Sequence, residues 1–329
     1  MTGMARAAEW WEYKLIPIFA TFYATALMLR VPVSGLWPAA LTVLLALVPG
    51  AVYVSVINDV TDREEDLAAG KINRVAGRNR AAIAAVLAIC TGTGVAISWW
   101  WRHDVLLLSL YLGAWLAFSL YSLPPFRFKT RGFLGVLADA SGAHLFPTLV
   151  AVTLAFRASG RAVDTPWLLA AGLWALAYGV RGILWHQLSD IEQDRQAGVR
   201  TFAQRHSPEL AARIGTFVAF PLELLALAIL LWRMHHVLPL LFLAFYGLLA
   251  TRRRACWHVD PVIVKPTAHF QIVLQEYYDV FYPLAILLAS ALQHRADVLA
   301  LAAHLLVFPM RALQTAKDSA QLTRQHLVR

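Results

Sequence analysis

Two short acidic segments stand out because most of this chain is apolar. The first contains Asn58, Asp62 and Asp66, and the second contains Asp190 and Asp194, so both place oxygen-bearing side chains four residues apart. If each segment continues a helix, this spacing directs the side chains to one face of it. Carboxylate and amide oxygens suit Mg²⁺, which usually takes one or two carboxylates and completes its shell with water and phosphate oxygens. The spacing therefore favours a magnesium site that also holds a phosphorylated substrate.

Basic side chains surround both acidic segments and supply the positive charge that a bound diphosphate would need. Acids and cations together favour a polyphosphate site over a simple cation site. The alternative is that charged helix ends face water and hold no ligand, as surface charges commonly do. The matching spacing of the two segments weighs against this alternative. The basic residues are Lys71, Arg74, Arg78, Lys129, Arg131, Arg195 and Arg200.

The elements that carry these segments are predicted membrane helices. The chain has 329 residues, of which 59% are hydrophobic and 15% charged, and its apolar stretches have the length of about 20 residues that a bilayer requires. We predict an all-α, polytopic membrane helix bundle that forms one domain over residues 1–329. The expected spans are 14–30, 37–57, 81–101, 105–122, 135–156, 167–188, 210–232, 236–250 and 278–293, with a weaker tenth at 297–311.

The distribution of basic residues predicts the topology. Arginine and lysine concentrate in the loops after the second, fourth, sixth and eighth spans, and such loops favour the cytoplasmic side. Both acidic segments then lie on the cytoplasmic face of a multi-pass protein of the cell (inner) membrane. The net charge of +9 follows this rule and requires no nucleic-acid partner. The first span is too long for a cleavable signal peptide, so we expect it to stay in the bilayer.

A few polar residues inside the predicted spans need partners or a function. Arg181 and Asp139 lie at membrane depth, where a charge should face the bundle interior or find a counter-ion. One hypothesis is that these two residues pair with each other across neighbouring helices. The other is that Asp139 and His186 line an acceptor pocket and orient or deprotonate a nucleophile. Tyr277 and Tyr278 open the ninth span, where we expect them to mark the membrane interface.

The motifs resemble those of the UbiA superfamily of intramembrane prenyltransferases. Residues 58–66 match its first acidic motif, with the spacing NDxxDxxxD, and Asp190 and Asp194 match the second, DxxxD. Residues 71–78 resemble the loop that follows the first motif, although Val75 replaces its usual proline. Residues 121–132 are similar to the signature after the fourth helix, with a tyrosine, two prolines and a lysine. The resemblance covers about residues 14–293.

The resemblance implies nine helices around a central cavity that is capped by the two acidic loops. It implies that Asn58, Asp62, Asp66, Asp190 and Asp194 hold Mg²⁺ and that Asp62, Asp66, Asp190 and Asp194 act in catalysis. The expected ligands of the diphosphate are Arg74, Tyr121, Lys129 and Arg131.

The activity that the resemblance implies is transfer of an isoprenyl group from a prenyl diphosphate to an electron-rich, lipophilic acceptor, such as an aromatic ring or a quinone precursor. The alternative within the superfamily is a terpene cyclase, which ionises and cyclises the prenyl chain without an acceptor. A cation-coupled transporter would usually carry its acids near the middle of the bilayer, whereas these acids lie at span ends.

Overall fold

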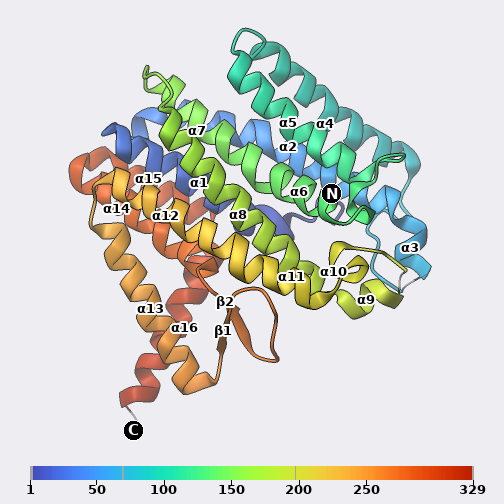
Figure 1. The fold of residues 1–329 in the computed structure, drawn as a ribbon. Helices are drawn as coiled ribbons and strands as arrows, with labels where there is room; N and C mark the ends of the chain where they lie inside the picture. The colour runs from blue at the N-terminus through green and yellow to red at the C-terminus, as the bar shows by residue number, and fades with distance from the viewer. Residues whose placement is uncertain (1–2, 69, 197, 328–329) are drawn as a thin grey trace.

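The computed structural model describes residues 3–68, 70–196 and 198–327, and nearly all of its regular structure is helical (Figure 1). Each predicted span overlaps a helix or a pair of consecutive helices. The longer helices are α1 (Ala7–Leu29), α2 (Trp37–Thr61), α4 (Arg80–Trp100), α5 (Val105–Ser122), α6 (Phe133–Ala140), α7 (Phe146–Ala158), α8 (Thr165–Ser189), α11 (Pro208–Ile214), α12 (Phe220–Met234), α13 (Leu238–Trp257), α14 (Tyr282–Gln293), α15 (Val298–Val307) and α16 (Pro309–Leu327). The short elements are α3 (Arg63–Ala68), α9 (Ile191–Gln196), α10 (Phe202–Arg205) and the parallel strands β1 (Asp260–Val262) and β2 (Phe270–Ile272).

Within the described residues, 6 helical segments are long and apolar enough to cross a membrane. A seventh is obtained if Arg295–Val307 and Pro309–Gln325 count as one span, although the chain bends there by 88°. This confirms a polytopic membrane helix bundle, while the count of nine spans stays a prediction. The predicted tenth span at 297–311 is interrupted at Phe308, since the following proline cannot donate a backbone hydrogen bond. The six segments are Val33–Thr61, Arg80–Trp100, Val105–Ser122, Phe133–Ala158, Thr165–Ser189 and Pro208–Met234.

Three of the helical segments contain a wider, π-helical turn just before a proline. The turns are Ser141–Leu145, Gly215–Ala219 and Tyr277–Phe281, and each is followed by a helix with proline in its first turn. A proline inside a helix lacks an N–H and crowds the carbonyl four residues earlier, and a π-turn relieves that crowding. These segments were predicted as parts of continuous spans, and the prolines within them were the sequence signal for the wider turns.

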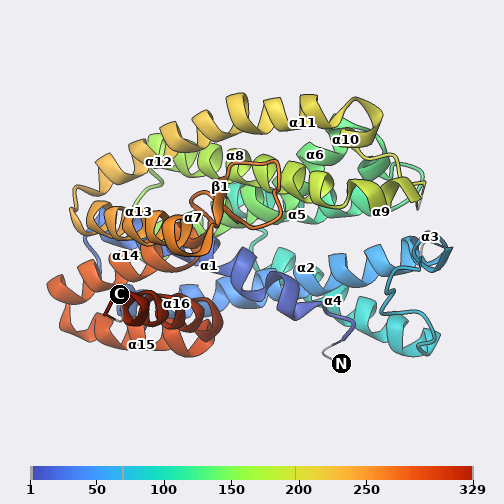
Figure 2. The same cartoon turned by 90° about the horizontal axis from the view of Figure 1, so that it is seen from below.

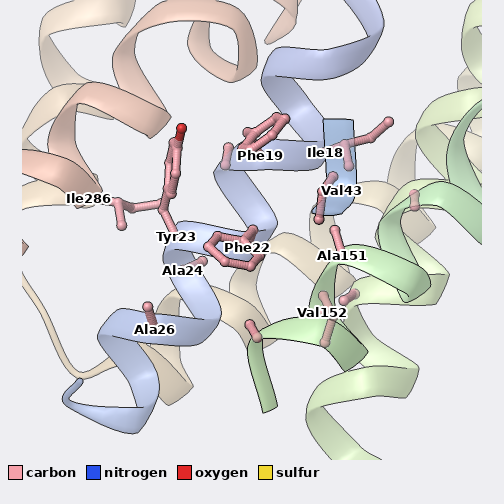
Figure 3. Close-up of a cluster of buried hydrophobic side chains, with 14 of the residues drawn as sticks. Ile18, Phe19, Phe22, Tyr23, Ala24, Ala26, Val43, Ala151, Val152 and Ile286 are labelled. Carbon is pink, nitrogen blue, oxygen red and sulfur yellow. The ribbon is translucent and has the colours of Figure 1, made fainter. Parts of the chain in front are cut away.

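Helix α1 lies at the centre of the hydrophobic core. Its residues Ile18 and Phe22 are almost fully buried, next to Val43 of α2, Val152 of α7 and Ile286 of α14 (Figure 3). Helix α1 therefore packs against both early and late parts of the chain. Because α1 has no side-chain cap at its N-terminus, its helical order depends mainly on this burial.

Buried acidic side chains attach the C-terminal part to this core. The Glu12 carboxylate accepts hydrogen bonds from the backbone N–H groups of Met310 (2.8 Å) and Arg311 (2.6 Å), at the start of α16. Arg253 of α13 donates to Glu276 at 2.5 and 2.9 Å and to Asp318 of α16 at 2.8 Å. Figure 1 shows α13 and α16 leaving the bundle on the same side.

Arg181 does not pair with Asp139, so that hypothesis was wrong. Its guanidinium donates to both carboxylate oxygens of Glu223 on α12, at 2.6 and 2.8 Å, and both side chains are almost fully buried. The Tyr278 hydroxyl also donates to Glu223, at 2.9 Å. Helices α8 and α12 pack directly against each other, which places the two charges together.

The prediction that Tyr277 and Tyr278 mark the membrane interface was also wrong. Both side chains are 0% exposed and belong to the core. The Tyr277 hydroxyl donates to the carbonyl of Pro239 at 2.9 Å. Their aromatic character suits an interface, but their hydroxyl groups find protein partners instead.

Breaking the Arg181–Glu223 pair should destabilise the bundle strongly, because the remaining charge would be buried without a partner. We expect Arg181→Met to lower the free energy of unfolding by about 3–5 kcal/mol. The double variant Arg181→Met/Glu223→Leu should lose less than the sum of the two single variants. Thermal and denaturant unfolding in detergent measures both quantities. Arg195→Met is the matched control, because Arg195 pairs with Glu192 on the surface, and it should leave Tm unchanged. If the losses in free energy of unfolding from the changes at 181 and 223 are additive, the two residues are not coupled.

Candidate functional site

The first acidic segment keeps helical geometry beyond the end of α2. Asp62 caps α2, its N–H donates to the carbonyl of Asn58 at 2.9 Å, and the N–H of Asp66 donates to the carbonyl of Asp62 at 2.8 Å. The bonding pattern of a helix therefore continues across the residue between α2 and α3. This confirms the expectation that the first acidic segment continues the helix.

The second acidic segment repeats the backbone of the first. Asp190 caps α8 with φ −98° and ψ 7°, close to the −101° and 2° of Asp62. Its N–H donates to the carbonyl of His186 at 3.0 Å, and the N–H of Asp194 donates to that of Asp190 at 2.8 Å. A glycine with φ near +70° ends each turn, Gly70 at 67° and Gly198 at 69°, a conformation that glycine adopts without strain.

The two acidic segments lie at the same end of the bundle. Figures 1 and 2 both place α3 and α9 there, at the right-hand side of each view. A direct ion pair links the loops, since Lys71 Nζ donates to Asp194 Oδ1 at 2.9 Å. The Tyr121 phenol lies within electrostatic range of Asp62 and Asp194, one from each segment. The chain thus gathers carboxylates from distant positions around one region.

Asp62 is held by two cations from the loop after α5. Lys129 forms a short ion pair with Asp62 Oδ1, and Arg127 Nη2 donates to the same oxygen at 3.1 Å. Arg127 also makes two hydrogen bonds of 2.7 Å to Glu65. Burial lowers the pKa of Lys129 while Asp62 opposes this shift, and the hydrogen bond to Glu65 raises the pKa of Arg127. Asp62 therefore lies in the most strongly cationic part of the site.

The other predicted ligands have simpler surroundings. Asn58 accepts a short hydrogen bond from the Ser122 hydroxyl, and Asp66 accepts one of 2.9 Å from the Asn73 amide. Asp190 lies 3.6 Å from His186 Nε2, and both are solvent-accessible. Asp59, the second residue of the motif, is buried, pairs with Arg6 and accepts from the N–H of Arg74 at 3.3 Å. Its contacts are those of a structural residue.

Two predicted diphosphate ligands have other partners. Arg74 forms a short ion pair with Glu9, at the start of α1. Arg131 donates to the carbonyl of Pro125 at 2.6 Å and is exposed. Lys129 and Tyr121 are the predicted ligands that lie close to the acids.

An apolar cavity of about 170 Å³ begins beside the first acidic segment. Asn58 lines it, and from there it follows α2 as far as Ala46. Asp139 lines it, whereas His186 is not among its lining residues and is 62% exposed in its side chain. That these two residues belong to an acceptor pocket stays a prediction. His186 is still within electrostatic range of Asp139. The remaining walls come from α1, α5 and the π-turn at 141–145, and they include Trp10, Leu15, Tyr111, Trp115, Phe118 and Ala143.

The donors fit a metal that shares its ligands with a substrate. In the described part of the chain, no group of three or more His, Cys, Asp or Glu side chains converges closely enough to hold a metal alone. The acids here supply hard oxygens, and most of them already have cationic or amide partners. This agrees with Mg²⁺, which needs few carboxylates when phosphate oxygens supply the rest.

Sequence reasoning missed three residues of this region. Arg127 and Glu65 extend the ion pairs of Asp62, and Lys14 is one of the residues that line the cavity. Lys14 stands at the boundary predicted for the first span, where a lysine is normally assigned to the interface. In the structure α1 starts at Ala7, so Lys14 lies two turns inside it. The position of Lys14 directly beside the apolar residues of the first span was the signal that could have identified it as a site residue.

A polytopic helix bundle with two matching acidic turns at one end defines the class of this protein. A model of the UbiA prenyltransferase family matches residues 18–263, and the chain belongs to this family. The fold of a UbiA homologue from Archaeoglobus fulgidus, solved with GPP and Mg²⁺, is similar, with a TM-score of 0.53 and 17% sequence identity over 92% of this chain and 99% of that one. A second structure of that protein, bound to DMAPP and Mg²⁺, gives a TM-score of 0.50 at 15% identity over 88% and 98%.

Two curated relatives are archaeal proteins named lycopene elongase/hydratase. The protein of Halobacterium salinarum is 34% identical over 160 residues, which are 48% of this chain and 54% of that protein. The protein of Haloferax volcanii is 30% identical over 204 residues, or 59% and 61%. The matched region spans about half to three fifths of the length of these relatives.

Gly135 should control the position of Lys129. A Cβ at this position would meet the carbonyl oxygen of Phe128 at 2.5 Å and Cα of Lys129 at 3.0 Å, so backbone must move. We expect Gly135→Ala to weaken binding of Mg²⁺-diphosphate by about tenfold or more, since displacements near 1 Å have such effects. Isothermal titration measures the affinity of each variant for Mg²⁺-diphosphate. Gly182→Ala on α8, where a Cβ meets nothing within 4 Å, is the control; equal affinity in both variants would show that this contact does not place Lys129.

Proposed function

We propose that this chain is a Mg²⁺-dependent prenyltransferase of the membrane, which moves an isoprenyl group from a prenyl diphosphate to an electron-rich acceptor and releases diphosphate. The observation that carries the proposal is the pair of matching acidic turns, joined by Lys71 and Asp194, beside an apolar cavity. Membership of the UbiA family supports it. The archaeal neighbour that shares the fold was solved with a prenyl diphosphate and Mg²⁺, which supports the same donor here.

The acidic end would hold the polar half of the donor. Asn58, Asp62, Asp66, Asp190 and Asp194 would bind Mg²⁺, which neutralises the charge that builds on the leaving diphosphate. Lys129 and Arg127 would exchange part of their contact with Asp62 for phosphate oxygens, while Tyr121 donates a hydrogen bond. The allylic carbon–oxygen bond breaks, and its electron pair leaves with the diphosphate.

The cavity would hold the apolar half. Its lining residues Trp115 and Phe118 present aromatic faces that can stabilise an allylic cation. Apolar walls exclude the water that would otherwise capture this cation. A nucleophilic carbon of the acceptor then forms the new bond and loses a proton, which balances the transfer.

The proposed acceptor is an aromatic ring or quinone precursor. The names of the archaeal relatives raise a long polyene as another candidate, and a terpene cyclase would need no acceptor. The charged lining residues Lys14 and Asp139 favour transfer to a polar acceptor over cyclisation of a hydrocarbon chain. We further propose that the acidic end lies on the cytoplasmic side of the inner membrane, as the distribution of basic residues among the loops predicts.

Loss of either acidic turn should abolish donor ionisation. We expect Asp62→Asn and Asp190→Asn each to reduce Mg²⁺-dependent diphosphate release by on the order of 10²-fold or more. The assay supplies purified protein with prenyl diphosphates of several chain lengths, with and without aromatic acceptors. Glu192→Gln, in the same turn as Asp190 but exposed and paired with Arg195, should behave like the unmodified protein.

Product analysis separates the two activities. A transferase forms a prenylated acceptor, whereas a cyclase supplied with donor alone releases a new hydrocarbon or terpene alcohol. Release that persists in both aspartate variants would refute the proposed site.

A further inference from the structure

Helix α16 leaves the bundle as a separate, polar element. The chain bends by 88° between α15 and α16, and α15 packs against α14 of the bundle. In Figure 2, α2 runs across the view, whereas α16 is seen almost end-on. Because the bundle helices cross the bilayer, a helix roughly perpendicular to them runs along the membrane surface. Helix α16 also lies beyond residues 18–263, so the family model does not describe it.

The inner face of α16 is attached to the bundle by a buried polar network. Asp318 accepts a hydrogen bond from Arg253 of α13 at 2.8 Å, and the Thr315 hydroxyl donates to Glu276 at 2.5 Å. Arg253 also pairs with Glu276 and is itself buried. Arg253 therefore engages both carboxylates of this region.

Exposed cations lie around this network. Helices α13 and α16 contact each other, and Trp257 near the end of α13 donates to Gln325 of α16 at 3.0 Å. Each exposed cation is next in sequence to a residue that joins the two helices. Over the stretches that the structure describes (3–68, 70–196 and 198–327), no carboxylate pairs with any of them. We call this group the basic surface, and it consists of Arg252, Arg254, Lys317 and Arg324.

Helix α13 fixes the depth of the basic surface. Its apolar side chains Leu241, Phe245 and Leu248 are exposed and follow one another at helical spacing. Exposed apolar side chains on a membrane helix face the acyl chains of the lipid. Arg252 follows Leu248 by four residues, which is about 6 Å along the helix axis. The basic surface therefore begins about one turn beyond the lipid-facing part of α13, at the level of the headgroups.

The outer face of α16 suits the same level. Met310 is 68% and Leu313 53% exposed. They precede Lys317 by seven and four residues, and Arg324 follows it by seven, so these four side chains share one face of the helix. A helix that lies in the membrane interface places apolar side chains at the boundary of the acyl chains and cations among the headgroups.

We infer that the basic surface binds the phosphate groups of anionic phospholipids, with α16 lying in the membrane interface. Arginine offers N–H donors in a fixed geometry that matches phosphate oxygens, and lysine adds a compact charge. Basic clusters beside a membrane helix or on an amphipathic helix are attracted to anionic lipid. A phosphatidylcholine headgroup carries its own cation, which weakens this attraction. The inference concerns attachment to the membrane and does not depend on the reaction.

The test compares binding of dioleoylphosphatidylglycerol with binding of dioleoylphosphatidylcholine, which has the same acyl chains but no net charge. Native mass spectrometry of the purified chain in detergent measures both affinities. We expect the unmodified protein to bind phosphatidylglycerol at least tenfold more tightly, because each basic residue near the membrane surface changes affinity for anionic lipid by about fivefold. For the same reason, Lys317→Gln/Arg324→Gln should lower affinity for phosphatidylglycerol by about tenfold or more and leave affinity for phosphatidylcholine unchanged.

Arg205→Gln/Arg213→Gln is the matched control. It removes two exposed cations from α10 and α11, which the basic residues of the loops assign to the same side of the membrane as the end of α13. It should leave the affinity for phosphatidylglycerol unchanged. Equal losses in the two double variants would show that total charge governs lipid binding, and they would overturn the inference.

Two results on the unmodified protein can also overturn the inference. Equal affinity for the two lipids would do so, and it would favour an acidic protein segment as the partner of the basic surface. Raising the ammonium acetate concentration should weaken binding of phosphatidylglycerol more than binding of phosphatidylcholine, because salt screens exposed charges. An affinity for phosphatidylglycerol that does not change with salt would contradict the inference. These measurements involve no substitution, so they hold even if a variant does not fold.

Discussion

An uncompensated charge is expensive in an apolar layer, and this constraint organises the whole bundle. The chain satisfies it in two ways. Arg181 and Glu223 form a dry, bidentate pair that is completed by Tyr278, with little solvent at either charge. At the acidic end, Lys71 with Asp194 and Arg127 with Asp62 form pairs that solvent still reaches.

These two kinds of pair differ in what they allow. A dry pair fixes the positions of its helices, because neither partner can leave without stranding a charge. A solvated pair can exchange one partner for another of the same sign at low cost. The acidic end is therefore suited to exchanging carboxylate for phosphate around its cations, while the rest of the bundle keeps its geometry. Lys14 and Asp139 are intermediate, since they share a cavity without a direct contact.

Sequence reasoning predicted the properties that follow from local pattern. Apolar runs located the helices, and the four-residue spacing of Asp62 with Asp66 and of Asp190 with Asp194 predicted side chains on one helical face. Partners that depend on which helices pack together were not predictable. Arg181 could be assigned to Asp139 as easily as to Glu223, because both acids lie in apolar stretches. Tyr277 is of a residue type that is common at membrane interfaces, and only tertiary packing places it in the core. Lys14 was hidden by an error of two turns in one helix boundary.

The contact between Glu12 and the start of α16 has a consequence for biosynthesis. The first-turn N–H groups of α16 have their acceptor on a residue that the ribosome makes about 300 residues earlier. When the C-terminal segment emerges, its cap is already in place on α1. Docking of α16 is thus templated by α1, which is synthesised before it.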